Sequence, residues 1–143
     1  MHYTLELPND LQVIERSVEY LMERGGELGF NHDRLRLNLR VGVSEALANA
    51  MLYGNCRDPG KRVLLEARLS PAAITIRVTD EGCGFDPDRL DDPTLPANRW
   101  RVGGRGIFLI RKLMDRVEFN ERGNSIEMML LNAPRDADGV DRC

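Results

Sequence analysis

Two side chains of one predicted helix have the chemistry of a metal site. Glu45 and Asn49 are four residues apart in a stretch of helical periodicity, so they lie one turn apart on the same side. Mg²⁺ prefers a few hard oxygen ligands and completes its shell with phosphate and water. We therefore expect Asn49 to offer its amide oxygen to Mg²⁺, with Glu45 beside it. The alternative is a solvated polar strip of a helix that binds nothing.

A carboxylate closes the second predicted strand of a hairpin. Asp80 follows an apolar row that runs from Ile74 to Val78 with a period of two, so it points to the same core-facing side. An unpaired charge there is costly, and a donor must meet it. An adenine amino group is a suitable donor, and glycines at positions 82 and 84 would let the backbone approach a flat base closely. A simple Asp-Gly turn is the alternative.

A glycine-rich turn precedes the last predicted helix. Gly103-Gly104-Arg105-Gly106 leaves the amides of a helix N-terminus uncovered, which makes an anion site, and Arg105 could add a charge-assisted contact to phosphate. The turn lacks the G-K-[ST] ending of a P-loop and the spacing of a dinucleotide fingerprint. Together the three motifs predict a nucleotide pocket with a metal ligand, a base-reading carboxylate and a phosphate turn.

The elements that must position these residues follow from periodicity. Alternation predicts strands at 3–7, 63–69, 74–78, 117–119 and 126–130, with turns at 70–72 and 122–124. Helical spacing predicts a first helix with Asn9 as its N-cap and Gly25-Gly26 as its end, a long helix from after Asp33 to about Tyr53, and a helix from Gly106 to Met114.

The long helix carries two apolar stripes that lie nearly opposite each other. The first comprises Leu35, Leu39, Val43, Ala46 and Ala50, and the second comprises Leu37, Val41, Ala48 and Leu52. We expect such a helix to be buried between layers, with Asn38, Glu45 and Asn49 along one edge. The second stripe would be covered by the first helix or by another subunit.

The order of elements, β-α-α-β-β-loop-α-β-β, predicts an α+β fold, a two-layer sandwich of a mixed β-sheet with helices on one face. We expect one domain over residues 1–132 and a frayed polar tail at 133–143. We expect residues 86–103 to form a loop too long for a simple connection, which is typical of a functional or a disordered segment.

Composition excludes several classes of protein. A net charge of −3 gives no basic footprint for direct nucleic-acid or membrane-surface binding, and no apolar run approaches the length of a membrane span. Three cysteines without metal-like spacing fit reduced thiols, and the N-terminus has no signal pattern, so we expect a cytoplasmic protein. Cys83, between two glycines, is better explained by its small size than by redox chemistry.

The combination of motifs resembles the GHKL ATPase superfamily over about residues 35 to 130. Within it, Val43-Ser-Glu45-Ala-Leu-Ala-Asn49-Ala and Gly104-Arg-Gly-Ile-Phe-Leu-Ile-Arg-Lys-Leu-Met-Asp115 are most similar to the anti-sigma-factor serine/threonine kinases. Neither His2 nor His32 lies in a dimerising helical hairpin of the kind that carries a phospho-acceptor histidine. Tyr53 stands where many relatives carry histidine.

The resemblance implies a role for each motif residue, with ATP and Mg²⁺ as cofactors. Asn49 would be the Mg²⁺ ligand, and Glu45 the base that draws a proton from an attacking serine hydroxyl or water. Asp80 would bind the adenine amino group, and residues 86–103 would form the lid. The remaining ATP-binding residues would be Gly82, Gly84, Gly104, Arg105, Gly106, Ile107, and Asn124 or Ser125. Strand phase favours Asn124 for that last position and hydroxyl chemistry favours Ser125.

The function that the resemblance implies is an ATP-dependent protein-serine kinase that is also an anti-sigma factor. It would bind a sigma factor and phosphorylate an anti-anti-sigma antagonist in a partner-switching pathway, and relatives commonly form homodimers. One alternative is a regulatory module in which ATP sets partner affinity without turnover. Another is the ATP-binding part of a split histidine kinase.

Overall fold

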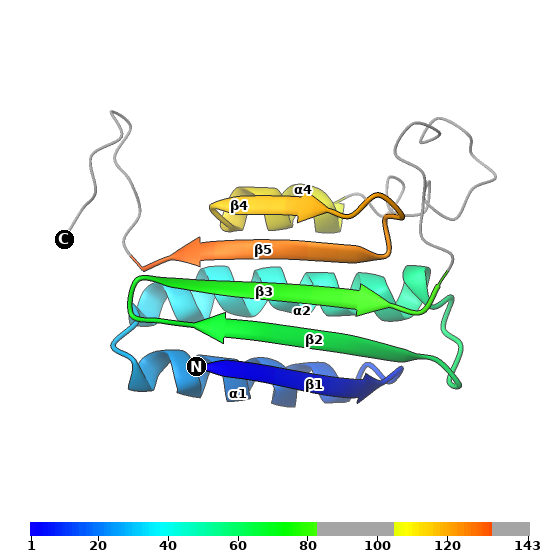
Figure 1. Ribbon diagram of the computed structural model, residues 1–143, viewed down its shortest axis with the longest axis horizontal. Coiled ribbons are helices and arrows are strands. Elements are labelled where there is room, and N and C mark those ends of the chain that lie inside the picture. The colour runs from blue at the N-terminus through cyan, green and yellow to red at the C-terminus, as the bar shows by residue number, and fades with distance from the viewer. Residues whose placement is uncertain (83–104, 133–143) are drawn as a thin grey trace.

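The computed structural model describes residues 1–82 and 105–132, which form two layers (Figure 1). One layer is a five-stranded sheet in the order β1-β2-β3-β5-β4, and the helices cover one of its faces. The strands are β1 (His2–Pro8), β2 (Arg62–Leu69), β3 (Ala73–Asp80), β4 (Arg116–Phe119) and β5 (Ser125–Leu131). The predicted α+β two-layer fold is confirmed.

The direction of the strands differs from the prediction of a mixed sheet. Each of the four strand pairs in the described ranges is antiparallel. Tight turns join β2 to β3 and β4 to β5, and such turns can only connect antiparallel neighbours. The expectation of a mixed sheet was therefore wrong, because no described pair uses the crossover connection that a parallel pair requires.

Three helical segments within the described residues pack on the sheet. The first is α1 (Val13–Glu27), and the last is α4 (Arg105–Leu113). Between them runs one long helix, in which α2 (Arg40–Asn49) is flanked by the π-type segments η1 (Arg34–Leu39) and η2 (Ala50–Gly54). The long helix follows the middle of the sheet, with α1 and α4 on its two sides (Figure 1).

The boundaries of α1 correct two predictions. Asn9 is not an N-cap: its amide nitrogen donates to the carbonyls of Met51 (3.2 Å) and Asp58 (3.0 Å), and the helix begins four residues later. Gly25 and Gly26 do not end the helix, which continues to Glu27. Gly25 is there for close packing, because a Cβ at this position would lie 2.8 Å from the side chain of Leu35.

The core lies between the sheet and the first apolar stripe of the long helix. All five members of that stripe are buried, and so are the inward residues of β2, β3 and β5. Among the described residues the second stripe is only partly covered: Leu37 is 53% exposed, and Val41, Ala48 and Leu52 are half-buried. Cover of this stripe by another subunit stays a prediction.

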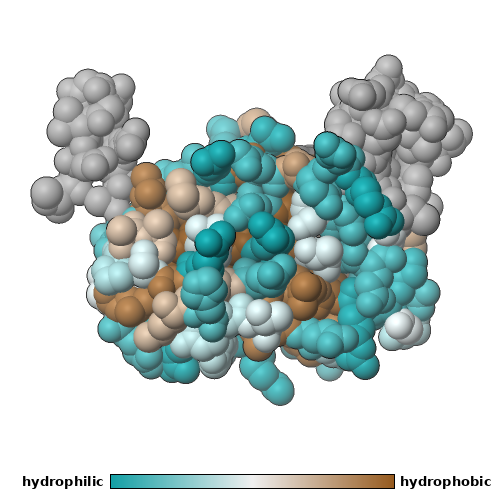
Figure 2. Space-filling model, in the orientation of Figure 1, coloured by the Kyte–Doolittle hydropathy of each residue, from teal (hydrophilic) through white to brown (hydrophobic). Residues whose placement is uncertain are grey.

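The other face of the sheet has no covering layer in the described ranges. Its side chains are largely hydrophilic, with apolar residues scattered among them (Figure 2). Arg77 of β3 lies 3.4 Å from Glu127 of the adjacent β5, and Arg68 of β2, on the far side of β3, lies 3.9 Å from it. Within residues 1–82 and 105–132, the helices are too short or too polar for a bilayer crossing.

Candidate nucleotide site

Asp80 is the last residue of β3 and lies on its buried, helix-facing row. Its side chain is enclosed, with the residue only 5% exposed, and Oδ1 accepts a hydrogen bond from the Gly82 N–H at 2.8 Å. Burial raises the pKa of the Asp80 carboxyl to about 6, although the Gly82 N–H, Lys61 and Arg122 each act to lower it. A carboxylate held at this cost at the end of a core strand is poised to accept a donor from a ligand.

The turn after Asp80 packs against the end of the long helix. A Cβ on Gly82 would collide with the carbonyl oxygen of Gly54, and a Cβ on Gly54 would collide with the Asp80 carboxylate. Both positions therefore require glycine. The sequence predicted close approach for Gly82, but it indicated Gly54 only as a helix stop, so this second glycine of the site was missed.

A buried amide fixes the same turn to its surroundings. Asn55 is fully buried, and its Oδ1 accepts from the Glu81 N–H at 2.8 Å. Its Nδ2 donates to the carbonyl of Arg62 (3.0 Å) and to Oδ1 of Asn9 (3.2 Å). Asn55 thus connects η2, β2 and the residue after Asp80, and nothing in its local sequence distinguishes this role from a helix-ending asparagine.

Glu45 and Asn49 meet the start of α4. A Cβ on Gly106 would lie 2.6 Å from Asn49 Nδ2 and 3.2 Å from Glu45 Oε2. Asn49 is 5% exposed, and its Nδ2 is buried without a hydrogen-bond partner among the described residues. Buried polar atoms are rarely left unpaired, so this amide is a candidate contact for a ligand. Which amide atom is nitrogen is an assignment, and the same position can present the oxygen.

A small cavity lies beside Asp80 on the helix-facing side of the sheet, and Glu45, Asn49 and Gly106 are not among the residues that line it. Ala46 and Ala50 line it from the long helix, Val78 and Asp80 line it from β3, and the loop to β5 closes it. The two alanines are one turn apart and leave room where larger side chains would fill the space. Apolar walls with one carboxylate at the end match the chemistry of a flat base with an exocyclic amino group, but the volume of about 10 Å³ holds about one water molecule, so the lining has to move apart to admit a base.

Asn124 and Ser125 have different hydrogen-bond partners. Asn124 stands opposite Asp80: its carbonyl accepts from the Asp80 N–H at 2.9 Å, and its Nδ2 donates to the Asp80 carbonyl at 3.2 Å. The Ser125 hydroxyl instead hydrogen-bonds Thr79 at 2.8 Å, on a row out of phase with Asp80. Asn124 therefore lies beside the backbone of Asp80, but both Asn124 and Ser125 line the cavity, so which of them contacts a ligand stays a prediction.

Several predicted site residues cannot be placed. Gly84, Gly104, Cys83 and the lid at 86–103 lie outside the described residues, as does the tail at 133–143. Arg105 begins α4, but its side chain is not described. Ile107 is half-buried next to Gly106. Asn38, on the same edge as Glu45, is used structurally, because its Nδ2 donates to the Leu113 carbonyl at 2.7 Å.

The described side chains offer few ligands for Mg²⁺. No group of three or more His, Cys, Asp or Glu side chains within the described ranges could hold a metal ion. A Mg²⁺ at Asn49 would therefore depend on oxygens of a bound phosphate and on water for most of its shell. The residues fit a metal that arrives with a nucleotide.

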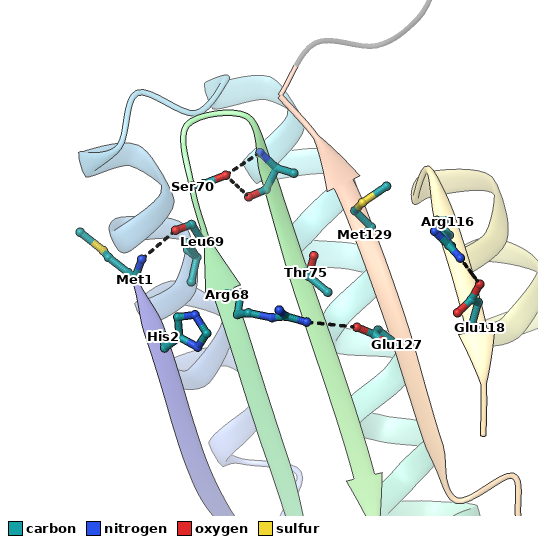
Figure 3. Close-up of a pocket in the computed structure, with 11 residues that line it drawn as sticks. Met1, His2, Arg68, Leu69, Ser70, Thr75, Arg116, Glu118, Glu127 and Met129 are labelled. Carbon is teal, nitrogen blue, oxygen red and sulfur yellow. Dashed lines mark hydrogen bonds and ion pairs between the residues drawn. The ribbon is translucent and has the colours of Figure 1, made fainter. Parts of the chain in front are cut away.

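A wider hollow lies on the uncovered face of the sheet, far from these motifs (Figure 3). Its charged side chains are largely paired with one another: Arg116 forms an ion pair with Glu118 at 2.5 Å, and Arg68 points toward Glu127. The Met1 ammonium group donates to the Leu69 carbonyl at 3.0 Å. The hollow holds none of the predicted site residues, and we assign the candidate site to the helix-facing side.

The fold agrees with comparisons to known proteins. The chain belongs to the histidine kinase-like ATPase domain family, whose model matches residues 7–130. This confirms the resemblance to the GHKL superfamily.

Within that family, the chain is similar to proteins named serine-protein kinase RsbW. The relative from Listeria innocua serovar 6a is 27% identical over 132 residues, covering 87% of this chain and 83% of the relative. The relative from Halalkalibacterium halodurans is 31% identical over 115 residues, covering 76% and 69%. In a crystal structure of the RsbU and RsbW domains of Rv1364c from Mycobacterium tuberculosis, the matching part has a TM-score of 0.63 and 16% identity. That match covers 92% of this chain and 31% of the longer one, and it supports the fold.

Proposed function

We propose that this chain is an ATP-dependent protein-serine kinase and anti-sigma factor that phosphorylates an anti-anti-sigma antagonist in the cytoplasm. The observation that carries the proposal is the meeting of Glu45, Asn49 and Gly106, where a buried amide lacks a partner at the start of α4. The relatives named serine-protein kinase support it. The kinase domain would span residues 1–132.

The adenine would lie in the cavity between the long helix and β3. Ala46, Ala50 and Val78 offer apolar walls, and the Asp80 carboxylate accepts a hydrogen bond from the exocyclic amino group. Asn124, in the loop just before β5, donates from its side chain to the backbone carbonyl of Asp80. Because Gly54 and Gly82 fix the turn, the carboxylate is held in place before a ligand arrives.

The phosphates would extend from this cavity toward the start of α4. The free backbone N–H groups of the helix N-terminus favour negative charge, and Gly106 has no side chain to cover them. Asn49 would hold Mg²⁺, which supplies charge neutralisation of the phosphates when bound. The carboxylate of Glu45 lies on the same edge, one helical turn from Asn49.

Glu45 would act as the base in phosphoryl transfer. As the partner's serine oxygen forms its bond to the γ-phosphorus, Glu45 accepts the hydroxyl proton, and the bond to the β–γ bridging oxygen breaks to release ADP. Gly106 keeps the space between Glu45 and Asn49 free of side-chain atoms. The protein's contribution is mainly position and charge.

The experiment is phosphotransfer from Mg-[γ-³²P]ATP to the purified antagonist protein. We expect acid-stable label on a serine with the wild-type chain. We expect Glu45→Gln to retain ATP affinity by calorimetry and to lose transfer. Transfer by Glu45→Gln at the wild-type rate would remove Glu45 from its role as base.

Two other outcomes would replace the proposal. ATP binding that changes partner affinity without any label transfer would indicate a regulatory module. Acid-labile phosphohistidine on a partner would indicate the ATP-binding part of a split histidine kinase.

A further inference from the structure

Two large apolar side chains are exposed on the outward side of the helical layer. Leu37 of η1 is 53% exposed and Phe108 of α4 is 62% exposed. Val41, one turn after Leu37, is half-buried and continues the same side of the long helix. Phe108 is two residues from the fully buried Ile110, which places it on the opposite side of α4 from the core.

The helices that carry these side chains are packed side by side. Asn38 Nδ2 donates to the Leu113 carbonyl, and a Cβ on Gly42 would lie 3.0 Å from Met114 Sδ. Leu37 adjoins Asn38 in the sequence and Lys112 adjoins Leu113, so the outward sides of η1 and α4 form one surface. We call this surface the basic apolar face; it comprises Leu37, Val41, Phe108, Arg36, Arg40, Arg111 and Lys112.

The charges of the basic apolar face are mostly uncompensated. Arg40 and Arg111 are exposed and make no ion pair within the described ranges, and Arg36 approaches Asp33 only at 3.6 Å. Lys112 Nζ lies 4.9 Å from the centroid of the Phe108 ring. The nearby Asp115 is already paired with Arg34 at 2.7 Å.

This local charge favours one kind of partner. The whole chain has a net charge of −3, whereas this surface carries four exposed cationic side chains, so its local charge is opposite in sign to that of the chain. Two copies joined through this surface would bring like charges together, which is costly. An acidic surface that also presents an apolar side chain is complementary in both respects.

The basic apolar face leads toward the proposed catalytic base. Leu37, Val41 and Glu45 follow one another at intervals of four residues on the long helix. Eight residues of helix span about 12 Å, so a partner bound over Leu37 would reach Glu45 with a short segment. We propose that the basic apolar face docks the serine-bearing protein substrate through an acidic surface with an exposed apolar side chain. This inference rests on the proposed function.

The test is steady-state phosphotransfer with the antagonist protein varied and Mg-ATP saturating. We expect Phe108→Ser and the double variant Arg111→Glu/Lys112→Glu to raise the KM for the antagonist at least tenfold. We expect kcat and the Kd for ATP to stay within twofold. The matched control is Leu11→Ser, because Leu11 is 48% exposed before α1 and should leave KM unchanged. Circular dichroism spectra of the variants should match that of wild type, which checks that each variant folds.

The dependence of KM on salt concentration is a second test of the docking proposal. For the wild-type chain, KM for the antagonist should rise with ionic strength, and this dependence should flatten in Arg111→Glu/Lys112→Glu. An unchanged KM in both variants, or a loss confined to kcat, would overturn the docking proposal. So would a wild-type dimer that dissociates in Phe108→Ser while KM is unchanged, since the face would then join two copies of this chain.

The proposed function can fail separately. If the wild-type chain transfers no label, the kinase proposal fails, and calorimetry of the same antagonist with wild type and variants still tests docking. Binding that weakens at least tenfold in Phe108→Ser, but not in Leu11→Ser, supports the basic apolar face. Equal binding in all three overturns it.

Discussion

Gly82 lies so close to the carbonyl oxygen of Gly54 that no side chain fits between them. The two glycines are 28 residues apart, and their contact joins the end of the long helix to the turn that holds Asp80. The position of the carboxylate therefore depends on two residues that carry no functional group themselves.

We predict that Gly82→Ala lowers the free energy of unfolding by about 1–3 kcal/mol, because the obstacle is a backbone carbonyl that cannot move aside cheaply. Urea denaturation measures the change. Gly26→Ala is the matched control: nothing lies within 4 Å of its added Cβ, and it should stabilise α1 by about 0.5–1 kcal/mol. Equal stability of wild type and Gly82→Ala would contradict the contact.

The second prediction concerns stability and pH. The pKa of Asp80 is about 6 in the folded chain and near 3.8 when unfolded, so the folded state binds more protons between these values. Below about pH 4 the carboxyl of Asp80 is protonated in both states and the folded state is favoured in full. As pH rises through 6 the carboxyl ionises and the free energy of unfolding falls. A difference of about two pKa units corresponds to a fall of up to about 3 kcal/mol.

Asp80→Asn should consequently be more stable than wild type at pH 8, and its advantage should shrink toward pH 4. Chemical denaturation of both proteins at pH 4.5, 6 and 8 measures the difference. Comparing the pair removes the effect of other carboxyl groups. An advantage that stays constant over this range would show that Asp80 does not titrate with a raised pKa.

The third prediction separates stability from binding at the same residue. A charged Asp80 accepts a stronger hydrogen bond than an amide does, so Asp80→Asn should weaken ATP binding roughly tenfold or more at pH 8. The ratio of the two affinities should approach one as pH falls below 6, where the wild-type carboxyl is protonated. Calorimetry across pH tests this, and a ratio independent of pH would remove Asp80 as the adenine contact.

The helix-facing phase of Asp80 could be predicted because alternation along a strand is a local property. The same rule favoured Asn124 for the last pocket position, whereas hydroxyl chemistry favoured Ser125, so the sequence left that choice open. The contact between Gly54 and Gly82, and the hydrogen bonds of Asn55, depend on how distant segments pack, so short-range patterns could not show them. The sequence left open what covers the stripe that contains Leu37 for a related reason: an apolar stripe indicates which residues avoid water, but it does not show whether a second layer or another subunit covers them.

The last prediction concerns Gly106. An added Cβ would meet the ends of the Asn49 and Glu45 side chains, which can move, so Gly106→Ala should cost little stability. The moved side chains would lose their positions for Mg²⁺ and for the serine proton. We therefore expect phosphotransfer to fall at least 100-fold while the midpoint of urea unfolding stays close to that of wild type. Gly42→Ala is the control, because its Cβ also meets a flexible side chain, that of Met114, away from the site. Equal losses of activity in Gly42→Ala and Gly106→Ala would show that the helix contact matters in general and that the space beside Asn49 has no special role.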